Sequence, residues 1–207
     1  MPVGGDRERA RGEGPVPVGR VGRHPDHAAV RDLRRVAARA RRRHRLELLF
    51  QGPAHTTNDV VAWIPSRGVL FAGDLVFNGG TPFVVMGSVS GSIAAVERLR
   101  ALAPSIVVPG HGDVCGVDVI DQQLDYLRFV QSVARSAVAD GMTPLEAATG
   151  LDLGAFAGWH DTERIVGNLH RAMAEERGLE PGGELDILAA IGDMITYNGG
   201  QPLRCLA

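Results

Sequence analysis

The apolar positions of this chain form short β-rich runs in its middle part and recur at helical spacing further on. Between residues 46 and 72 the runs LELLFQ, DVVAWI and VLFAG are short and rich in β-branched and aromatic residues, which is typical of strands. The sequence PSRG at 65–68, between the last two runs, has the composition of a tight turn. We therefore predict a strand, a loop and then a β-hairpin in this region.

The first of these runs has an alternative explanation. LELLFQGP differs by one residue from a viral protease cleavage tag, so it could be a remnant of an expression tag. We favour a natural strand, because the run passes directly into the strand and loop pattern that the following residues continue.

A helical period begins near residue 90. In SGSIAAVERLRALAP the apolar residues recur at three-residue spacing, and the run ends at Pro104. The next segment, SIVVPGHG, predicts a buried strand that leads into a loop. A strand, a helix and a strand in this order predict an α/β layer over residues 46–115, with helices packed on a sheet.

The pattern beyond residue 116 is helical almost to the end of the chain. We predict helices at about 118–140, 161–177 and 184–197, with Asp161 as a helix cap. Thr143 and Glu146 flank Pro144 and Leu145 in the arrangement of a capping box, which predicts a further helix start. Residues 116–207 are therefore expected to form a helical extension.

Charge divides the chain more sharply than its total suggests. The 207 residues carry a formal net charge of −2, and all 22 basic residues are arginine. Residues 1–45 hold 13 of these arginines against five acidic residues and contain no Phe, Tyr or Trp. This first segment therefore has little with which to build a core, whereas residues 46–207 are acidic.

Three interpretations of residues 1–45 remain open. Arginines neutralise phosphates, so the segment could bind nucleic acid or another anionic surface. It could instead be a solvated, disordered tail that contains a basic helix in places. A GC-rich gene translated out of frame would also yield mostly Arg, Ala, Gly and Pro.

The ends of the chain and its cysteines add few constraints. The first residues, MPVGGDRERARGEG, are charged throughout and do not resemble a secretory signal, which favours the cytoplasm. No apolar run approaches the roughly 20 residues that span a bilayer, so we do not expect a membrane protein. We expect Cys115 and Cys205 to be buried free thiols rather than a disulfide, and we assign them no chemical role.

Three short elements each place a potential metal ligand at the end of a predicted strand. They are GPAHT at 52–56, FAGD at 71–74 and PGHG at 109–112, and they carry His55, Asp74 and His111. An α/β scaffold brings such strand ends together. Two imidazoles and a carboxylate suit zinc, and a carboxylate can bridge two metal ions.

In this order and context, AHT, AGD and PGHG resemble the second half of the metallo-β-lactamase superfamily. The resemblance implies the C-terminal half of an αββα sandwich with a helical C-terminal extension, and it covers about residues 46–207. It implies that His55 is the third histidine of a first metal site, that Asp74 bridges both metals and takes part in catalysis, and that His111 is a ligand of the second site. Two zinc ions would occupy an intact centre of this family.

The family's other ligands come from an earlier His-x-His-x-Asp-His motif. The nearest candidate here is GRHPDH at 22–27, which offers His24, Asp26 and His27 but has glycine in place of the first histidine. No hydrophobic strand leads into it. Without these residues, three ligands are divided between two metal positions, so neither set is complete.

The segment from GPAHTTNDVV onward, with GGTPFVVMGS and YNGGQPLRCLA, is most similar to actinobacterial cyclases of aromatic polyketide pathways, a role in antibiotic biosynthesis. The absence of lysine fits such a source. The resemblance therefore implies a metal-dependent enzyme that cyclises a polyketide. Alternatives are a hydrolase of acyl thioesters or esters, similar to hydroxyacylglutathione hydrolase, and a truncated, inactive fragment.

Other residues and partners are interpreted more simply. Asp59 and Asp113 lie close in sequence to His55 and His111 and could orient them, but loop or cap roles are favoured. We expect His170 to be packed in a helix or at the surface rather than to bind metal. The expected partner is a small-molecule substrate, and nucleic acid is the least favoured because residues 46–207 are acidic.

Overall fold

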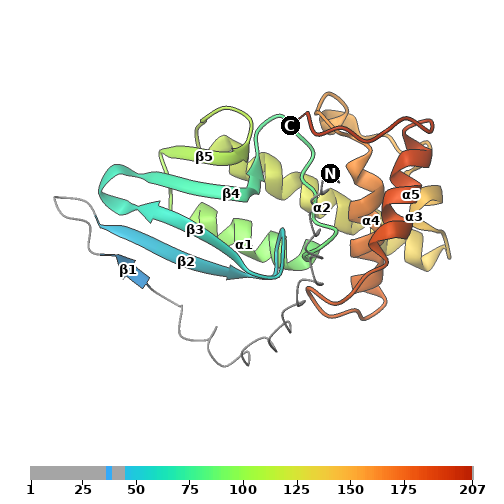
Figure 1. The fold of residues 1–207 in the computed structure, drawn as a ribbon, viewed down its shortest axis with the longest axis horizontal. Coiled ribbons are helices and arrows are strands. Elements are labelled where there is room, and N and C mark those ends of the chain that lie inside the picture. The colour runs from blue at the N-terminus through green and yellow to red at the C-terminus, as the bar shows by residue number, and fades with distance from the viewer. Residues whose placement is uncertain (1–35, 39–44, 207) are drawn as a thin grey trace, which may run out of the picture.

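The computed structural model describes residues 36–38 and 45–206. This part of the chain forms a mixed five-stranded sheet with helices packed on one face and at one end (Figure 1). The strands lie in the sheet in chain order, and β4 and β5 are the parallel pair, whereas the other neighbours are antiparallel. The strands are β1 (Val36–Ala38), β2 (Leu46–Gly52), β3 (Asp59–Ile64), β4 (Val69–Phe77) and β5 (Ile106–His111). The predicted α/β class is confirmed.

The strands predicted from the runs between residues 46 and 72 are present. LELLFQG forms β2, and β3 and β4 are joined by the short 3-10 turn η2 (Pro65–Arg67). Gly68 follows this turn with φ 61°, a left-handed conformation that glycine adopts without steric cost. The run that resembles the viral protease tag therefore forms a strand of the sheet.

The expectation of a basic helix is wrong where the structure describes that segment. Val36–Ala38 is a strand that pairs with β2, with Val36 opposite Leu48. The edge of β2 offers backbone donors and acceptors, and pairing with them overrides the local helical preference of an alanine-rich and arginine-rich sequence. The other residues of that segment lie outside the described part, apart from Arg45.

The helices form two groups. α1 and α2 pack against the sheet, whereas α3, α4 and α5 gather beyond the end of the sheet at which β2 and β4 finish (Figure 1). The helices are α1 (Val89–Ala101), α2 (Asp118–Ala139), α3 (Pro144–Ala148), α4 (Arg164–Glu176) and α5 (Ile187–Tyr197), with the 3-10 turn η3 (Gly154–Phe156). The helices predicted from residue 90 to the end of the chain are present with similar bounds. None of those that the structure describes is long and apolar enough to cross a membrane.

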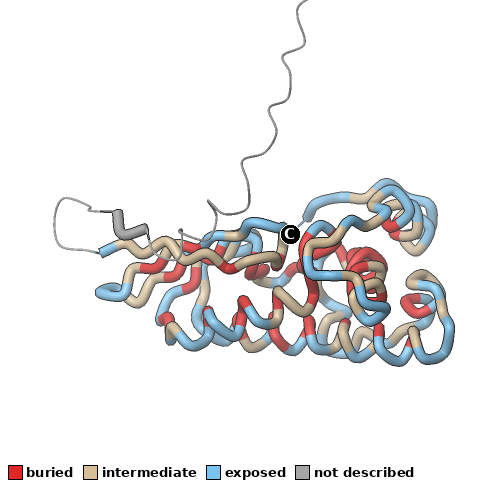
Figure 2. The backbone as a smooth tube through the Cα atoms, turned by 90° about the horizontal axis from the view of Figure 1, so that it is seen from below, coloured by how far each residue is buried: buried red, intermediate tan, exposed pale blue. Residues whose placement is uncertain are grey.

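The hydrophobic core lies between the sheet and α1 and α2, and it continues into the contacts of α4 with α2. Leu70 and Val107 of the sheet and Leu99 of α1 are fully buried in this core. Figure 2 shows that the buried residues lie where the helices meet the strands. In β3 and the first part of β4, buried residues alternate with more exposed ones, as a half-buried sheet requires. The core fixes β4 and β5, from which two of the three predicted ligands project.

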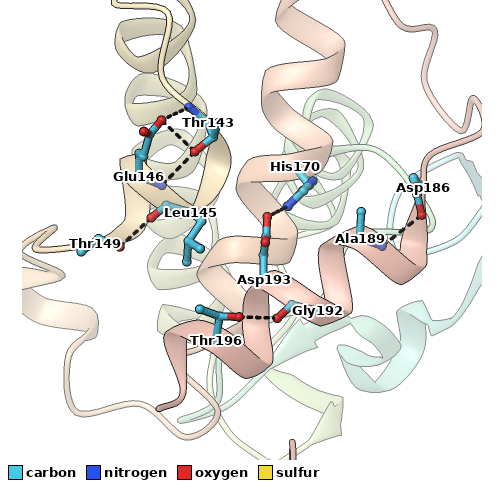
Figure 3. A network of polar contacts seen from close by, with 10 residues as sticks. All are labelled: Thr143, Leu145, Glu146, Thr149, His170, Asp186, Ala189, Gly192, Asp193 and Thr196. Carbon is cyan, nitrogen blue, oxygen red and sulfur yellow. Dashed lines mark hydrogen bonds and ion pairs between the residues drawn. The ribbon is translucent and has the colours of Figure 1, made fainter. Parts of the chain in front are cut away.

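Two predictions about helix starts have different outcomes. Thr143 and Glu146 form the predicted capping box at α3, with both reciprocal bonds present (Figure 3). Asp161 is not the cap of α4, because the N-cap position is Glu163. Asp161 is buried, has φ 56°, and instead accepts the backbone N–H of Leu206 near the C-terminus. The carboxylate of Asp161 therefore binds a backbone group that is distant in the chain, instead of a backbone group at the start of α4.

Neither cysteine forms a disulfide bond, as predicted, but the expectation that both are buried is wrong. Cys115 is partly buried beside β5, where its backbone pairs with Val107. Cys205 is exposed in the C-terminal segment.

Candidate metal centre

His55 lies in the loop that follows β2. Its side chain is 18% exposed and faces the ends of β4 and β5. The loop is ordered by Asp59, whose carboxylate accepts the backbone N–H of Thr56 at 2.9 Å and the hydroxyl of Thr56 at 2.8 Å. Asp59 therefore has the loop role favoured from the sequence, and it stabilises the turn that carries the histidine.

Asp74 lies on an irregularity in the β4–β5 pairing. Gly73 is opposite Pro109 and Phe77 is opposite His111, so three residues of β4 face one residue of β5. This bulge turns the carboxylate across Gly110, since a Cβ atom added at Gly110 would lie 2.0 Å from Oδ1 of Asp74. Glycine at 110 therefore provides the space that the Asp74 side chain occupies.

His111 ends β5 and lies flat against an aromatic ring. Its imidazole stacks on Phe77 with ring centroids 4.6 Å apart and planes 7° from parallel. The backbone of His111 accepts a hydrogen bond from the N–H of Asn78, and the Asn78 side chain donates to the carbonyl of Asp113. The loop after β5 is thus tied to the end of β4.

The three predicted ligands converge on the carboxylate of Asp74. Nε2 of His55 lies 3.6 Å from Oδ2 of Asp74, and Nε2 of His111 lies 3.7 Å from Oδ1. Each histidine therefore faces a different oxygen of one carboxylate. The Asp74 side chain is 46% exposed, so the convergence point is open to solvent.

The electrostatics favour a neutral His55. Burial lowers the pKa of its imidazole below the ordinary value of 6.5, and His111 acts in the same direction. Asp74, Asp59 and a backbone group of Phe83 oppose this shift without cancelling it. Nδ1 of His55 is buried and has no hydrogen-bond partner in the described part of the chain. A neutral imidazole is the form that binds a metal.

The donor set fits zinc in kind and in spacing but is incomplete in number. Two ligands of one tetrahedral zinc ion, each about 2.1 Å from it, lie about 3.4 Å apart, which is close to both histidine–carboxylate distances. Each pair would give an ion only two protein ligands, fewer than the three that catalytic zinc takes. Accordingly, no group of three or more His, Cys, Asp and Glu side chains in residues 36–38 and 45–206 forms a ready metal site.

The other residues considered from the sequence lie elsewhere. His24, Asp26 and His27 are outside the described residues. His170 pairs with Asp193 of α5 at 2.7 Å, which agrees with the packed role expected for it (Figure 3).

Two residues beside the centre were not identified from the sequence. Phe77 supports His111, and the guanidinium of Arg164 lies 5.7 Å from the centroid of the same Phe77 ring. Arg164 also donates to the carbonyl of Thr81 at 2.8 Å. A single arginine near the start of a helix gives no sequence signal for this contact, because 87 positions separate it from Phe77. Phe77, three residues after Asp74, could have been considered.

Comparisons with known proteins match part of this chain. The model of the metallo-beta-lactamase superfamily matches residues 2–111. The match includes the arginine-rich segment and ends at His111, so it begins earlier and ends earlier than the resemblance over residues 46–207 that the sequence suggested.

Individual relatives match a smaller part. A metallo-beta-lactamase type 2 of Bacteroides fragilis is 26% identical over 98 residues, which cover 44% of this chain and 39% of the relative. The chain thus spans about two fifths of that relative. A solved metallo-beta-lactamase from Pontibacter korlensis is 26% identical with a TM-score of 0.41, over 45% of this chain and 46% of that one. The DIM-1 metallo-beta-lactamase is 22% identical with a TM-score of 0.38, over 41% of each chain.

Proposed function

The chain belongs to the metallo-beta-lactamase superfamily, whose members are mostly metallo-hydrolases and typically bind zinc, and we propose that it carries three of the ligands of a two-zinc centre. In this proposal Asp74 would serve both cations, His55 one of them and His111 the other. The observation that carries it is the position of one carboxylate between two imidazoles, at 3.6 and 3.7 Å.

The side chains have distinct roles in this proposal. His55 is held in its neutral form by burial, so it offers a lone pair without first losing a proton. Phe77 holds the plane of His111. A bound zinc pair would supply an electrophile that polarises a substrate carbonyl and activates water for attack. The remaining ligands would come from His24, Asp26 and His27.

We propose an apolar carbonyl compound of the aromatic polyketide class as the substrate, with ring closure as the reaction. Support comes from the surroundings of His55. A Cβ atom added at Gly87 would lie 2.6 Å from the carbonyl carbon of His55, so the loop that carries Met86 lies directly against the histidine. Met86 is 52% exposed, and Phe83, next to the buried Val84, is half-buried. The exposed Met86 side chain offers an apolar surface next to the segment that carries His55, whereas the Phe83 ring packs on the core against Gly167.

Hydrolysis of a lactam or a thioester is the second candidate. The relatives are named metallo-beta-lactamases, which favours a lactam, and the same ligand set would serve any of these reactions. Turnover of a chromogenic β-lactam, an acyl thioester and an aromatic polyketide, measured side by side, separates the candidates. Turnover of the polyketide alone supports the first proposal, whereas turnover of either other substrate alone overturns it.

Zinc binding by the full chain tests the centre itself. We expect competition with a chromogenic chelator to detect two zinc ions per chain, and Asp74→Asn to weaken both by at least about tenfold because it removes the shared charge. Asp113→Asn is the matched control, since only its backbone carbonyl contacts Asn78. Zinc binding that is equal in Asp74→Asn and the parent chain would overturn the proposal.

A further inference from the structure

One face of α4 carries three buried polar side chains, those of Arg164, Asn168 and Arg171. They are at most 8% exposed, and their spacing of four and three residues places them on the same side of the helix. Arg164 donates to the carbonyl of Thr81, and the other two bind backbone groups of the residues that follow. We call residues 81–88, which lead from β4 toward α1, the linking segment.

Asn168 holds one peptide unit of the linking segment from both sides. Its Nδ2 donates to the carbonyl of Pro82 at 2.8 Å, and its Oδ1 accepts the N–H of Val84 at 3.0 Å, so Phe83 lies between two fixed neighbours. The backbone of Phe83 in turn raises the pKa of His55, and a carbonyl is the backbone group that favours a protonated imidazole. Asn168 therefore fixes backbone that lies beside a candidate ligand.

Arg171 holds the next part of the linking segment. Its Nε and Nη2 both donate to the carbonyl of Val85, at 3.0 and 2.7 Å, and its Nη1 donates to the carbonyl of Gly183 at 2.8 Å. The N–H of Gly182 donates to the carbonyl of Gly87 at 3.2 Å. Arg171 therefore joins the linking segment to the loop between α4 and α5.

The linking segment ends against the loop that presents His55. The N–H of Ser88 donates to the carbonyl of Ala54 at 2.8 Å. A Cβ atom added at Gly87 would lie 1.9 Å from that carbonyl oxygen and 2.6 Å from the carbonyl carbon of His55, so the two backbones are in direct contact. Because a packed interior transmits displacement, a shift of the linking segment would shift the backbone of His55.

We propose that Asn168 and Arg171 are positioning residues for His55, because they hold the linking segment that sets the place and orientation of its imidazole. The proposal rests on the proposed function in so far as His55 binds zinc, but the contacts themselves join protein groups alone. α4 then serves both histidines, since Arg164 lies over the ring that stacks on His111. The helical extension thus shapes the centre without supplying a ligand.

Nuclear magnetic resonance of the metal-free full chain tests the positioning directly. The ring signal of His55 is assigned by its loss in His55→Gln. We expect Arg171→Met to shift or broaden this signal and to leave the ring signal of His111 in place, since the stack on Phe77 is untouched. Met173→Ala is the matched control, because Met173 is fully buried on the same helix and its truncation only opens a cavity. It should leave both ring signals in place.

Zinc affinity provides the second measurement. We expect Arg171→Met and Asn168→Ala to weaken it about tenfold, as for other residues that orient a metal ligand, and Met173→Ala to leave it unchanged. Arg171→Lys keeps the charge and a donor for the carbonyl of Val85. It is the milder variant if Arg171→Met does not fold, and it should shift the His55 signal by a smaller amount. Circular dichroism establishes that each variant is folded.

The two measurements separate this proposal from the zinc centre. A His55 signal that is the same in the parent chain and in every folded variant of Asn168 and Arg171 overturns the positioning role. A signal that moves equally in Met173→Ala also overturns it, and so does zinc binding that Arg171→Met leaves unchanged. A His55 signal that moves as expected in a chain that binds no zinc supports the positioning role and overturns the zinc centre.

Discussion

The ring of Phe77 lies between the imidazole of His111 and the guanidinium of Arg164. The imidazole stacks on it at 4.6 Å, and the guanidinium lies 5.7 Å from its centroid. Phe77 is only 2% exposed, so its ring is held on all sides. The orientation of a candidate metal ligand thus depends on a residue that belongs to the core of the protein and on a helix distant in sequence.

Replacement of this ring should therefore impair zinc binding more than folding. We predict that Phe77→Leu weakens zinc affinity about tenfold, the lower end of the effect of residues that orient metal ligands. Chelator competition measures the affinity, and thermal unfolding reports the stability. Phe129→Leu is the control, because Phe129 packs on Phe156 away from the centre. Equal losses of affinity in the two variants would contradict the prediction.

Gly110 should be intolerant of any side chain. An added Cβ atom would lie 2.0 Å from Oδ1 of Asp74 and 2.7 Å from the carbonyl carbon of Gly73, so both the carboxylate and the strand must move. We predict that Gly110→Ala lowers the free energy of unfolding by about 2 kcal/mol and weakens zinc binding. Denaturant unfolding and chelator competition measure the two effects.

Gly116→Ala serves as the control for this substitution. Nothing lies within 4 Å of a Cβ atom at Gly116, so the change in unfolding free energy should stay within about 0.5 kcal/mol. Similar stabilities of the two alanine variants would show that β4 moves away from β5 without cost.

Arg164 should hold the C-terminal segment in place. Its Nη2 pairs with Asp161 at 2.8 Å and lies 3.4 Å from Sγ of Cys205, and Asp161 in turn accepts the N–H of Leu206. We predict that Arg164→Met destabilises the protein by roughly 3 kcal/mol, because it leaves the buried Asp161 carboxylate without its charged partner. Hydrogen exchange of the Leu206 amide should become faster.

Thiol labelling gives an independent measure of the same segment. Burial raises the pKa of Cys115, so this thiol should react slowly at mildly alkaline pH, and Cys205 should be modified first. Arg164→Met should accelerate labelling of Cys205 alone. Arg100→Met, which removes an exposed pair with Asp121, should change neither rate. An unchanged Cys205 rate in Arg164→Met would mean that the segment is held by other contacts.

The capping box of α3 predicts a specific pH dependence (Figure 3). The backbone N–H and hydroxyl of Thr143 lower the pKa of Glu146 below its ordinary 4.5. The folded state therefore favours the ionised form, so its stabilising contribution is present above the unfolded pKa and is lost as the pH falls through the folded pKa.

Nuclear magnetic resonance titration of the Glu146 carboxyl measures this shift. We predict that Thr143→Ala returns its pKa toward 4.5. Thr149→Ala should not, because the hydroxyl of Thr149 donates to the carbonyl of Leu145 and does not contact Glu146. A Glu146 titration that is the same in Thr143→Ala and the parent chain would show that the box does not form in solution.

Local sequence determined much of this protein. The short β-rich runs became β2, β3 and β4, the three-residue spacing after residue 90 became α1, and the pattern around Thr143 became a capped helix, because each depends on neighbours in the chain. His55, Asp74 and His111 could be identified as candidates for the same reason, since each follows a recognisable strand pattern and a glycine or an alanine. The structure places Asp74 within β4, which continues to Phe77, rather than at the end of the strand.

Tertiary structure alone decided the rest. Phe77 and Arg164 support the candidate centre, Asp161 binds the C-terminal segment instead of capping α4, and Val36–Ala38 is a strand rather than a helix. These outcomes depend on partners far away in the chain, whose pairing carries no local signal.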